Sequence, residues 1–118
     1  MTRYSFEFES HGIFAIAGRG LVFRGIVLSG QAMEGDRITI LDSDGAVSGK
    51  IIAIEKDRRL MLRTVADSEI GILLADFSNQ HLEQMLAPHH QPHDSPNQDA
   101  YQKMLGVSFP VRLAKIDP

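Results

Sequence analysis

The sequence contains no cysteine, no tryptophan and no long hydrophobic run. Without cysteine, disulfide bonds and thiolate metal sites are excluded. No apolar stretch approaches the ~18 residues that indicate a membrane-spanning helix. The first residues, Met-Thr-Arg-Tyr-Ser-Phe-Glu, also lack the apolar core of a secretory signal. We therefore expect a cytoplasmic protein that has no contact with a membrane.

Neither sign of charge dominates. Lysine and arginine number 12 against 15 aspartates and glutamates, which gives a formal net charge of −3. This balance disfavours a protein that coats nucleic acid nonspecifically, although it is compatible with a local basic surface. The length of 118 residues and the 43% hydrophobic content suit one globular core.

Enzyme signatures are missing as well. No G-x-x-x-x-G-K-[ST] phosphate-binding loop occurs, so nucleotide hydrolysis is not expected. Gly18-Arg19-Gly20 is an isolated G-x-G between two β-rich segments, unlike a strand-to-helix dinucleotide motif. Ser10-His11 has no spacing typical of a catalytic triad. We predict no catalytic residues and no cofactor.

Glycines punctuate the β-rich run from Phe14 to Ile40, FAIAGRGLVFRGIVLSGQAMEGDRITI. Gly18 and Gly20 flank a turn in which a positive φ is favourable, and Gly25 favours a bulge or strong coiling. This pattern predicts hairpins rather than helices. We expect strands at about 4–10, 13–17, 21–28, 37–42, 47–56, 60–65 and 70–75.

Apolar residues alternate with polar ones along several of these segments. Phe6 and Phe8 occupy alternate positions, as do Ile52 and Ile54, which is typical of strands with one buried face. Closure into a barrel removes the free edges that such a sheet would expose. We predict an all-β fold, a small closed antiparallel β-barrel over residues 1–88.

A short helical turn and a polar loop follow the barrel strands. Ser78 is predicted to cap the turn and Pro88 to end it. The loop at 88–98, PHHQPHDSPNQ, has no large apolar side chain and is expected to be solvated. The potential metal ligands in and near this loop are His81, His89, His90, His93 and Asp94. Their spacing fits no closed site, so we predict no metal site.

The C-terminal extension, residues 89–118, is expected to contain this loop, a short helix and a final strand. A helix is predicted over 99–105, ended by Gly106. Alternation over 107–116 predicts a strand that packs back on the barrel, and Pro110 favours an edge position for it.

The glycine-rich run also carries a motif. Its fixed points are Phe14, Ile16, Gly18-Arg19-Gly20, Val22, Gly25, Val27, Gly30 and Gly35-Asp36. They resemble the consensus F-x-I-x-G-R-G-T-V-V-T-G-R-V-x-x-G-x-x-x-x-G-D of the second, β-barrel domain of translation GTPases such as elongation factor Tu. The match continues to Ile70-Gly71-Ile72-Leu73-Leu74, which resembles a V-G-x-x-L ending, and covers about residues 6–88. In the family a GTPase domain precedes this barrel, and because the sequence has no phosphate-binding loop we expect no such domain here.

The resemblance implies a site on the outer surface of the barrel, which in the family helps to hold the aminoacylated 3′ end of transfer RNA. Glu55 corresponds to a glutamate that packs against the terminal adenine, and Arg58 to an arginine near the acceptor end. Phe14 and Ile16 occupy pocket positions. The alternative is that Glu55 and Arg58 are solvated strand-end charges and that Phe14 and Ile16 belong to the core.

Other pocket positions depart from the family pattern. His11 and Gly12 replace an acidic pair, Arg24 replaces a threonine, and Glu69 replaces an asparagine. We expect the pocket to differ from that of the family in volume and charge.

Cations are frequent in this part of the chain. They are Arg19, Arg24, Lys50, Lys56, Arg58, Arg59 and Arg63. If they converge they can neutralise phosphates, and otherwise they form a charged solvent face. The expected RNA- or ligand-binding residues are Phe14, Ile16, Arg19, Arg24, Glu55, Arg58 and Arg59.

Two functions remain open. The first is a non-enzymatic binding module that contacts transfer RNA, the ribosome or another translation component. The second is a protein-interaction adaptor, or a homodimer, that keeps the barrel without RNA binding and uses the strand edge near Val107 to Ile116.

Overall fold

Strands account for most of the residues that the structure describes. The computed structural model describes residues 4–16, 18–65, 67–86 and 98–116. The strands are β1 (Tyr4–Ile16), β2 (Gly20–Gly30), β3 (Arg37–Ile40), β4 (Ser48–Lys56), β5 (Arg59–Met61), β6 (Glu69–Ala75) and β7 (Val111–Ile116). The helices are α1 (Gln80–Met85) and α2 (Gln98–Leu105).

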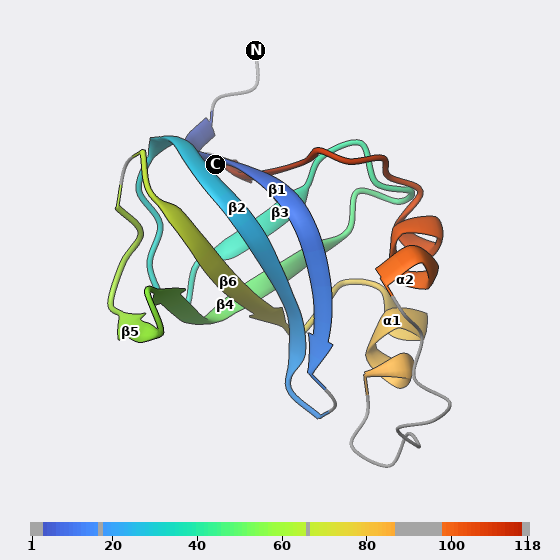
Figure 1. Ribbon diagram of the computed structural model, residues 1–118. Helices are drawn as coiled ribbons and strands as arrows, with labels where there is room; N and C mark the ends of the chain where they lie inside the picture. Colours follow the sequence, from blue (N-terminus) through green and yellow to red (C-terminus); the bar gives the residue numbers. More distant parts are fainter. Residues whose placement is uncertain (1–3, 17, 66, 87–97, 117–118) are drawn as a thin grey trace.

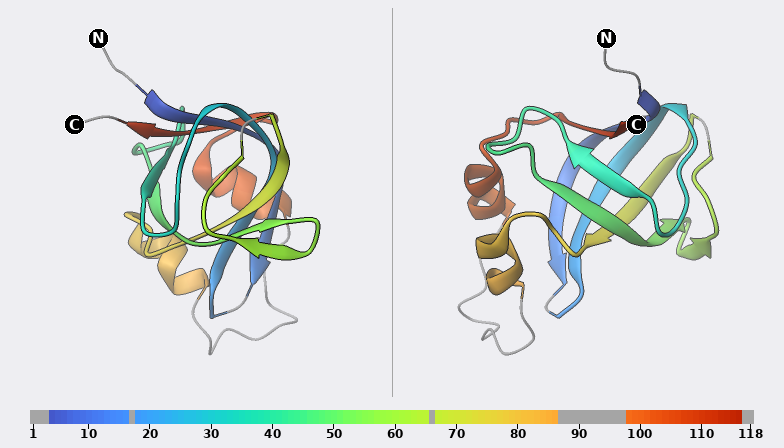
Figure 2. Two further views of the ribbon diagram at one scale, coloured as in Figure 1. Left: turned by 90° about the vertical axis from the view of Figure 1, so that its left-hand side faces the viewer. Right: turned by 180° about the vertical axis from the view of Figure 1, so that it is seen from behind.

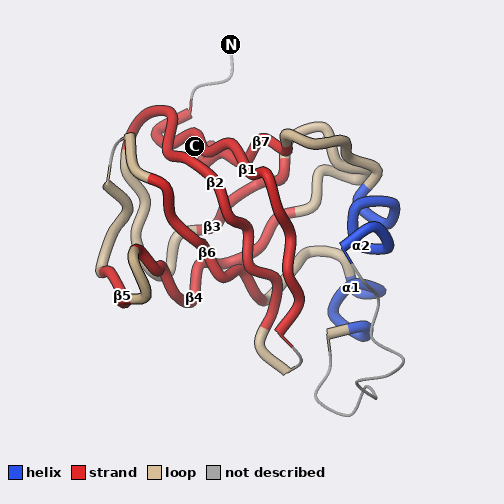
Figure 3. The backbone as a smooth tube through the Cα atoms, in the orientation of Figure 1, coloured by secondary structure: helices blue, strands red, loops and turns tan. Residues whose placement is uncertain are grey.

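The strands form a closed ring. Antiparallel pairing joins them in the order β3-β7-β1-β2-β6-β4, and a further pairing of β4 with β3 completes the circle. Figures 1 and 3 show this ring from one side, and Figure 2 shows the strands curving around a common interior. Within the described ranges, β5 pairs with β4 alone and stands outside the ring. The predicted closed antiparallel β-barrel is confirmed.

β1 is one long strand where the sequence predicts two. The expected break near His11 is a β-bulge, because the register against β2 shifts between Ser10 and Gly12. A bulge adds one residue, so the inward-facing positions change from even to odd numbers along the strand. Phe8 before the bulge and Ile13 after it are both buried in the core.

β4 also contains a bulge, which changes the predicted alternation of buried residues. The register against β6 shifts between Ile51 and Ala53, and the buried side chains are those of Ile51 and Ile54. The simple alternation that paired Ile52 with Ile54 on the inner face is therefore wrong, and Ile52 lines a cavity on the outer surface.

Gly25 permits a close approach of β1 to β2. A Cβ atom at this position would overlap the carbonyl oxygen of Glu9 and lie 2.7 Å from the Cα of Ser10. Gly25 pairs directly with Ser10, so the bulge predicted at this glycine lies on the strand opposite it. Only glycine fits here without moving the backbone of β1.

The two helices lie together on one side of the ring (Figures 1 and 2). Leu82 of α1, Leu86 directly after it, and Tyr101 and Leu105 of α2 are buried with the barrel core. The helices therefore extend the core beyond the ring. Residues 88–97 of the predicted polar loop lie outside the described residues.

The N-cap of α1 differs from the prediction. The side chain of Asn79, rather than that of Ser78, accepts a hydrogen bond from the backbone N–H of Leu82 at 3.0 Å. The hydroxyl of Ser78 accepts the backbone N–H of Ser48 at 2.9 Å instead. Ser78 therefore ties the start of α1 to β4.

β7 lies between two ring strands. It pairs with β1 from Ile116 to Val111, and with β3 through Ala114 and Leu113. The predicted edge position is therefore wrong, because β7 is paired with a strand on each side. Pro110 lies just before the first residue of β7, where its missing N–H removes no ladder hydrogen bond. The ring thus contains strands from both sides of residue 88.

Candidate functional site

The pairing register places two rows of residues on the outer face of the barrel. Residues directly opposite each other in antiparallel strands share one face. One row consists of Gly12, Arg24, Gly71, Glu55 and Leu60. The next row consists of Phe14, Val22, Leu73 and Ala53. A partly charged row therefore lies beside an apolar one.

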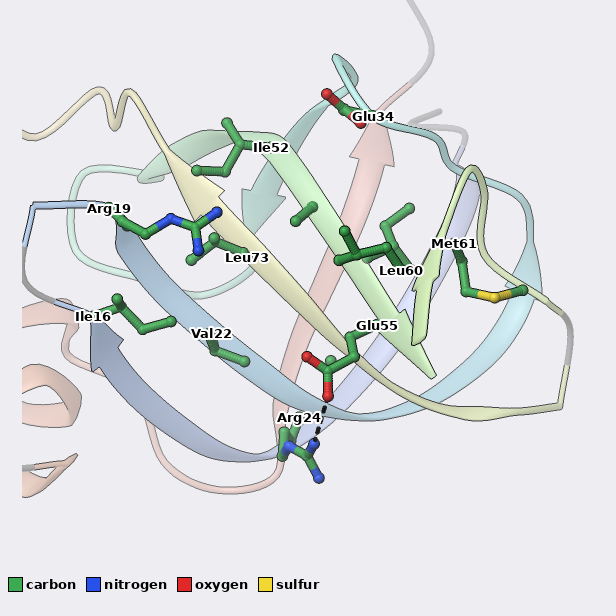
Figure 4. A pocket seen from close by; sticks show the side chains of 13 residues that line it. Ile16, Arg19, Val22, Arg24, Glu34, Ile52, Glu55, Leu60, Met61 and Leu73 are labelled. Atoms are coloured by element: carbon green, nitrogen blue, oxygen red, sulfur yellow. Dashed lines mark ion pairs between the residues drawn. The ribbon is translucent and has the colours of Figure 1, made fainter. Parts of the chain in front are cut away.

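A cavity of about 390 Å³ opens on this face (Figure 4). Its apolar lining includes Val22, Ile52, Leu60 and Leu73. Its charged lining consists of Arg19, Arg24, Glu34 and Glu55. Arg19, just before β2, lies apart from the pair formed by Arg24 and Glu55, and Val22 lies between Arg19 and Arg24 in the sequence (Figure 4). The cavity can thus hold an apolar group between two guanidinium groups.

Arg24 and Glu55 form an ion pair across β2, β6 and β4. Their Nη2 and Oε1 atoms are 3.8 Å apart, and the two side chains are 56% and 45% exposed. An exposed pair of this kind contributes little to stability, so Arg24 can exchange Glu55 for a ligand oxygen. The arginine that departs from the family pattern therefore contacts the glutamate that the resemblance assigns to adenine packing.

A smaller hollow of about 290 Å³ adjoins this pair. Its charged residues are Arg24, Glu55, Asp57, Arg58 and Glu69. Three carboxylates face two guanidinium groups, so this hollow is less favourable for a phosphate than the larger cavity. Glu69, a second departure from the family pattern, contributes one of the carboxylates.

Arg58 lies at the tip of the hairpin formed by β4 and β5. Lys56 pairs with Arg59, which leaves Asp57 and Arg58 as a two-residue turn. Their φ angles are 52° and 67°. Positive φ at both central positions is typical of a type I′ turn, which favours asparagine and glycine. An arginine at this position is therefore less favourable for the stability of the turn than asparagine or glycine.

The structure brings together four of the seven predicted site residues. Ile16, Arg19, Arg24 and Glu55 line the larger cavity, and Arg58 lines the smaller hollow. Phe14 lies on the same outer face but outside both hollows. Arg59 also lies outside both hollows, and it pairs with Lys56 on the face of the hairpin opposite Glu55 and Leu60. Phe14 is 50% exposed and Ile16 is 37% exposed, so the alternative that these two residues belong to the core is wrong.

The seven cations do not converge on one patch. Arg19 and Arg24 line the larger cavity, whereas Lys50 lies opposite Arg37 in the pairing of β3 with β4. The Nζ of Lys56 donates to the hydroxyl of Ser68 at 3.3 Å.

Glu34, Ile52, Leu60 and Met61 also line the larger cavity, and the sequence analysis missed them. One signal was present, because Leu60 and Leu62 alternate with Arg59 and Arg63 in a short segment beside a turn.

No group of three or more potential metal ligands occurs in residues 4–16, 18–65, 67–86 and 98–116. His89, His90, His93 and Asp94 lie outside these ranges, so the metal prediction is not tested. Neither α1 nor α2 is long and apolar enough to cross a membrane.

Two elongation factors contain a part that resembles this chain in structure. Bacterial selenocysteine-specific elongation factor EF-Sec matches with a TM-score of 0.62 and 15% identity, over 95% of this chain and 15% of that protein. Translation elongation factor SelB from Methanococcus maripaludis, in its apo form, matches with a TM-score of 0.62 and 16% identity, over 96% of this chain and 19% of that protein. The sequence matches no protein-family model and no curated protein.

These matches confirm the resemblance to a domain of translation GTPases at the level of the fold. The chain spans less than a fifth of the length of either factor. At this level of identity the likeness defines the fold and leaves the ligand to be inferred from the site.

Proposed function

We propose that the chain is a non-enzymatic binding module of translation. It contacts transfer RNA, the ribosome or another translation component in the cytoplasm through the outer face of its barrel. The observation that carries this proposal is the larger cavity, in which Ile16, Arg19, Arg24 and Glu55 gather around an apolar lining. The fold likeness to parts of two elongation factors supports the same setting.

The end of a transfer RNA fits this cavity through two kinds of contact. A ribose or base would lie against Val22 and Leu73, and a phosphate would accept hydrogen bonds from Arg19 or Arg24. Because Glu34 and Glu55 offset these two charges, we expect modest affinity that falls as salt rises. Each phosphate contact to a single strand contributes about −0.7 to the slope of log K against log salt concentration.

Fluorescence anisotropy of labelled bulk transfer RNA at low and moderate salt tests the proposal. In the variant Gly71→Ala, the new methyl group would lie 3.5 Å from Cγ1 of Val22, which is ordinary contact, so it occupies part of the cavity without straining the fold. The variant Arg58→Gly removes a cation and suits the positive φ of the turn. We expect Gly71→Ala to weaken binding, and Arg58→Gly to weaken it and flatten the salt slope by about 0.7.

Lys103→Gln is the matched control, because it removes a cation from α2, on the other side of the molecule from β5 (Figure 1). It should bind transfer RNA as the unmodified chain does. Absence of salt-sensitive binding, or equal binding by all these variants, would count against the proposal.

A second candidate function is a protein-interaction adaptor or a homodimer that keeps the barrel without RNA binding. The exposure of Leu60 and Leu62, at 80% and 82%, favours it. Sedimentation and pull-down experiments separate the two functions. A strict monomer that retains only nucleic acid would remove this second candidate.

A further inference from the structure

β5 has an open strand edge. In the described part of the chain it pairs with β4 on one side and with no strand on the other. Glu55 lies opposite Leu60, next to the pair of Lys56 and Arg59 that closes the two-residue turn. Hydrogen-bonded pairs alternate with non-bonded pairs in an antiparallel ladder, and the pair that closes such a turn is bonded. The backbone N–H and C=O of Leu60 therefore point away from β4.

Two leucines at this edge are almost fully exposed. Leu60 is 80% and Leu62 is 82% exposed, more than any other large apolar residue described. The hairpin of β4 and β5 reaches out from the ring (Figure 2, left), so the barrel itself does not cover them. Proteins usually protect such edges, because exposed apolar strands pair with other chains.

The charge around this edge favours one kind of binding partner. The segment KDRRLMLR, residues 56–63, carries four cations and one aspartate in a chain with a net charge of −3. A second copy would bring the same positive edge against this one, which is repulsive. The phosphates of RNA would neutralise the cations, but the segment has no aromatic ring on which bases could stack. An acidic polypeptide matches both the charge and the open backbone groups.

We propose that the edge of β5 docks an extended acidic segment of a partner protein, which adds a strand beside β5. The backbone of the partner pairs with the N–H and C=O of Leu60. Its apolar side chains cover Leu60 and Leu62 on one face, and its carboxylates lie near Arg59 and Arg63 on the other. The inference rests on the second candidate function, and it shares Leu60 with the cavity proposed for transfer RNA.

A labelled peptide in which glutamate alternates with valine tests this docking site. A second peptide, in which lysine replaces glutamate, is the control. Fluorescence anisotropy should show binding of the glutamate peptide and none of the lysine peptide. Leu60→Pro removes the outward N–H without removing a hydrogen bond of the ladder, and we expect it to weaken binding about tenfold or more.

Arg63→Glu is a second variant, which keeps the test valid if proline disturbs the hairpin. It should weaken binding of the glutamate peptide and leave the folded state intact, because Arg63 is exposed. Lys103→Gln on α2 should bind the glutamate peptide as the unmodified chain does. Thermal unfolding of each variant establishes that it is folded.

Three results would overturn the docking site: no binding of either peptide, equal binding of both, or unchanged binding by Leu60→Pro and Arg63→Glu. A dimer that Leu60→Pro dissociates would assign the edge to a second copy instead. Transfer RNA binding is measured on Leu62→Ser, which removes an exposed apolar side chain of this edge outside the larger cavity and should retain transfer RNA binding. The peptide and transfer RNA assays can therefore fail separately, and loss of transfer RNA binding in Leu62→Ser would assign the edge to RNA.

Discussion

Replacement of Gly25 by alanine tests the closure of the barrel at the contact between β1 and β2. The added Cβ would overlap the carbonyl oxygen of Glu9 and lie 2.7 Å from the Cα of Ser10. Both neighbours are backbone atoms of β1, which is held by β2 and by β7, so the clash is relieved only by separating paired strands. Overpacking costs about 1–3 kcal/mol, and each hydrogen bond lost adds about 1 kcal/mol.

We therefore expect Gly25→Ala to lower the free energy of unfolding by about 3–5 kcal/mol. The total free energy of unfolding of a domain of this size is roughly 6–18 kcal/mol. Urea and thermal unfolding followed by circular dichroism should show a fall in the thermal midpoint of about 10 °C or more.

Gly71→Ala is the matched control for this experiment, because its Cβ would meet only side-chain atoms at 3.5 Å or more. It should change the free energy of unfolding by less than about 1 kcal/mol. Equal midpoints for Gly25→Ala and the unmodified chain would refute the close approach of β1 to β2.

Two further predictions concern the helices. Burial raises the pKa of Tyr101 above its usual value, so the unfolded chain loses this proton first as pH rises above about 10. Stability should then decline, and Tyr101→Phe should flatten that decline in urea unfolding across this range; an unchanged profile would contradict it. Asn79→Ala removes the N-cap of α1 and should lower the free energy of unfolding by about 1 kcal/mol in the same assay. Gln80→Ala, in the exposed first turn, should lower it by less. Equal costs for these two variants would exclude Asn79 as the cap.

The sequence predicts the strands and the barrel well because both depend on local patterns. Glycines mark the turns, and β-branched residues fill the segments between them. The bulge expected at Gly25 lies on the strand opposite it, at Ser10 to Gly12 of β1. The bulge at Ile51 to Ala53 in β4 escaped prediction because strict alternation assumes one register along each strand. The interior position of β7 escaped it because the neighbours of a strand depend on ring closure.

The candidate site was predicted in part. The motif resemblance found Ile16, Arg19 and Glu55, and Arg24 was found as a cation that departs from the motif. The four residues line one cavity. Leu60 was missed because a leucine in a β-rich segment usually faces the core. Its exposure follows from the position of β5 outside the ring, which no local pattern reveals.

Chemical-shift mapping of the ¹⁵N-labelled chain during titration with transfer RNA tests the central claim most directly. The account predicts that the largest amide shifts occur at Arg24, Gly71 and Glu55, which form one row across β2, β6 and β4. Shifts confined to α1 and α2, or no shifts at all, would contradict it.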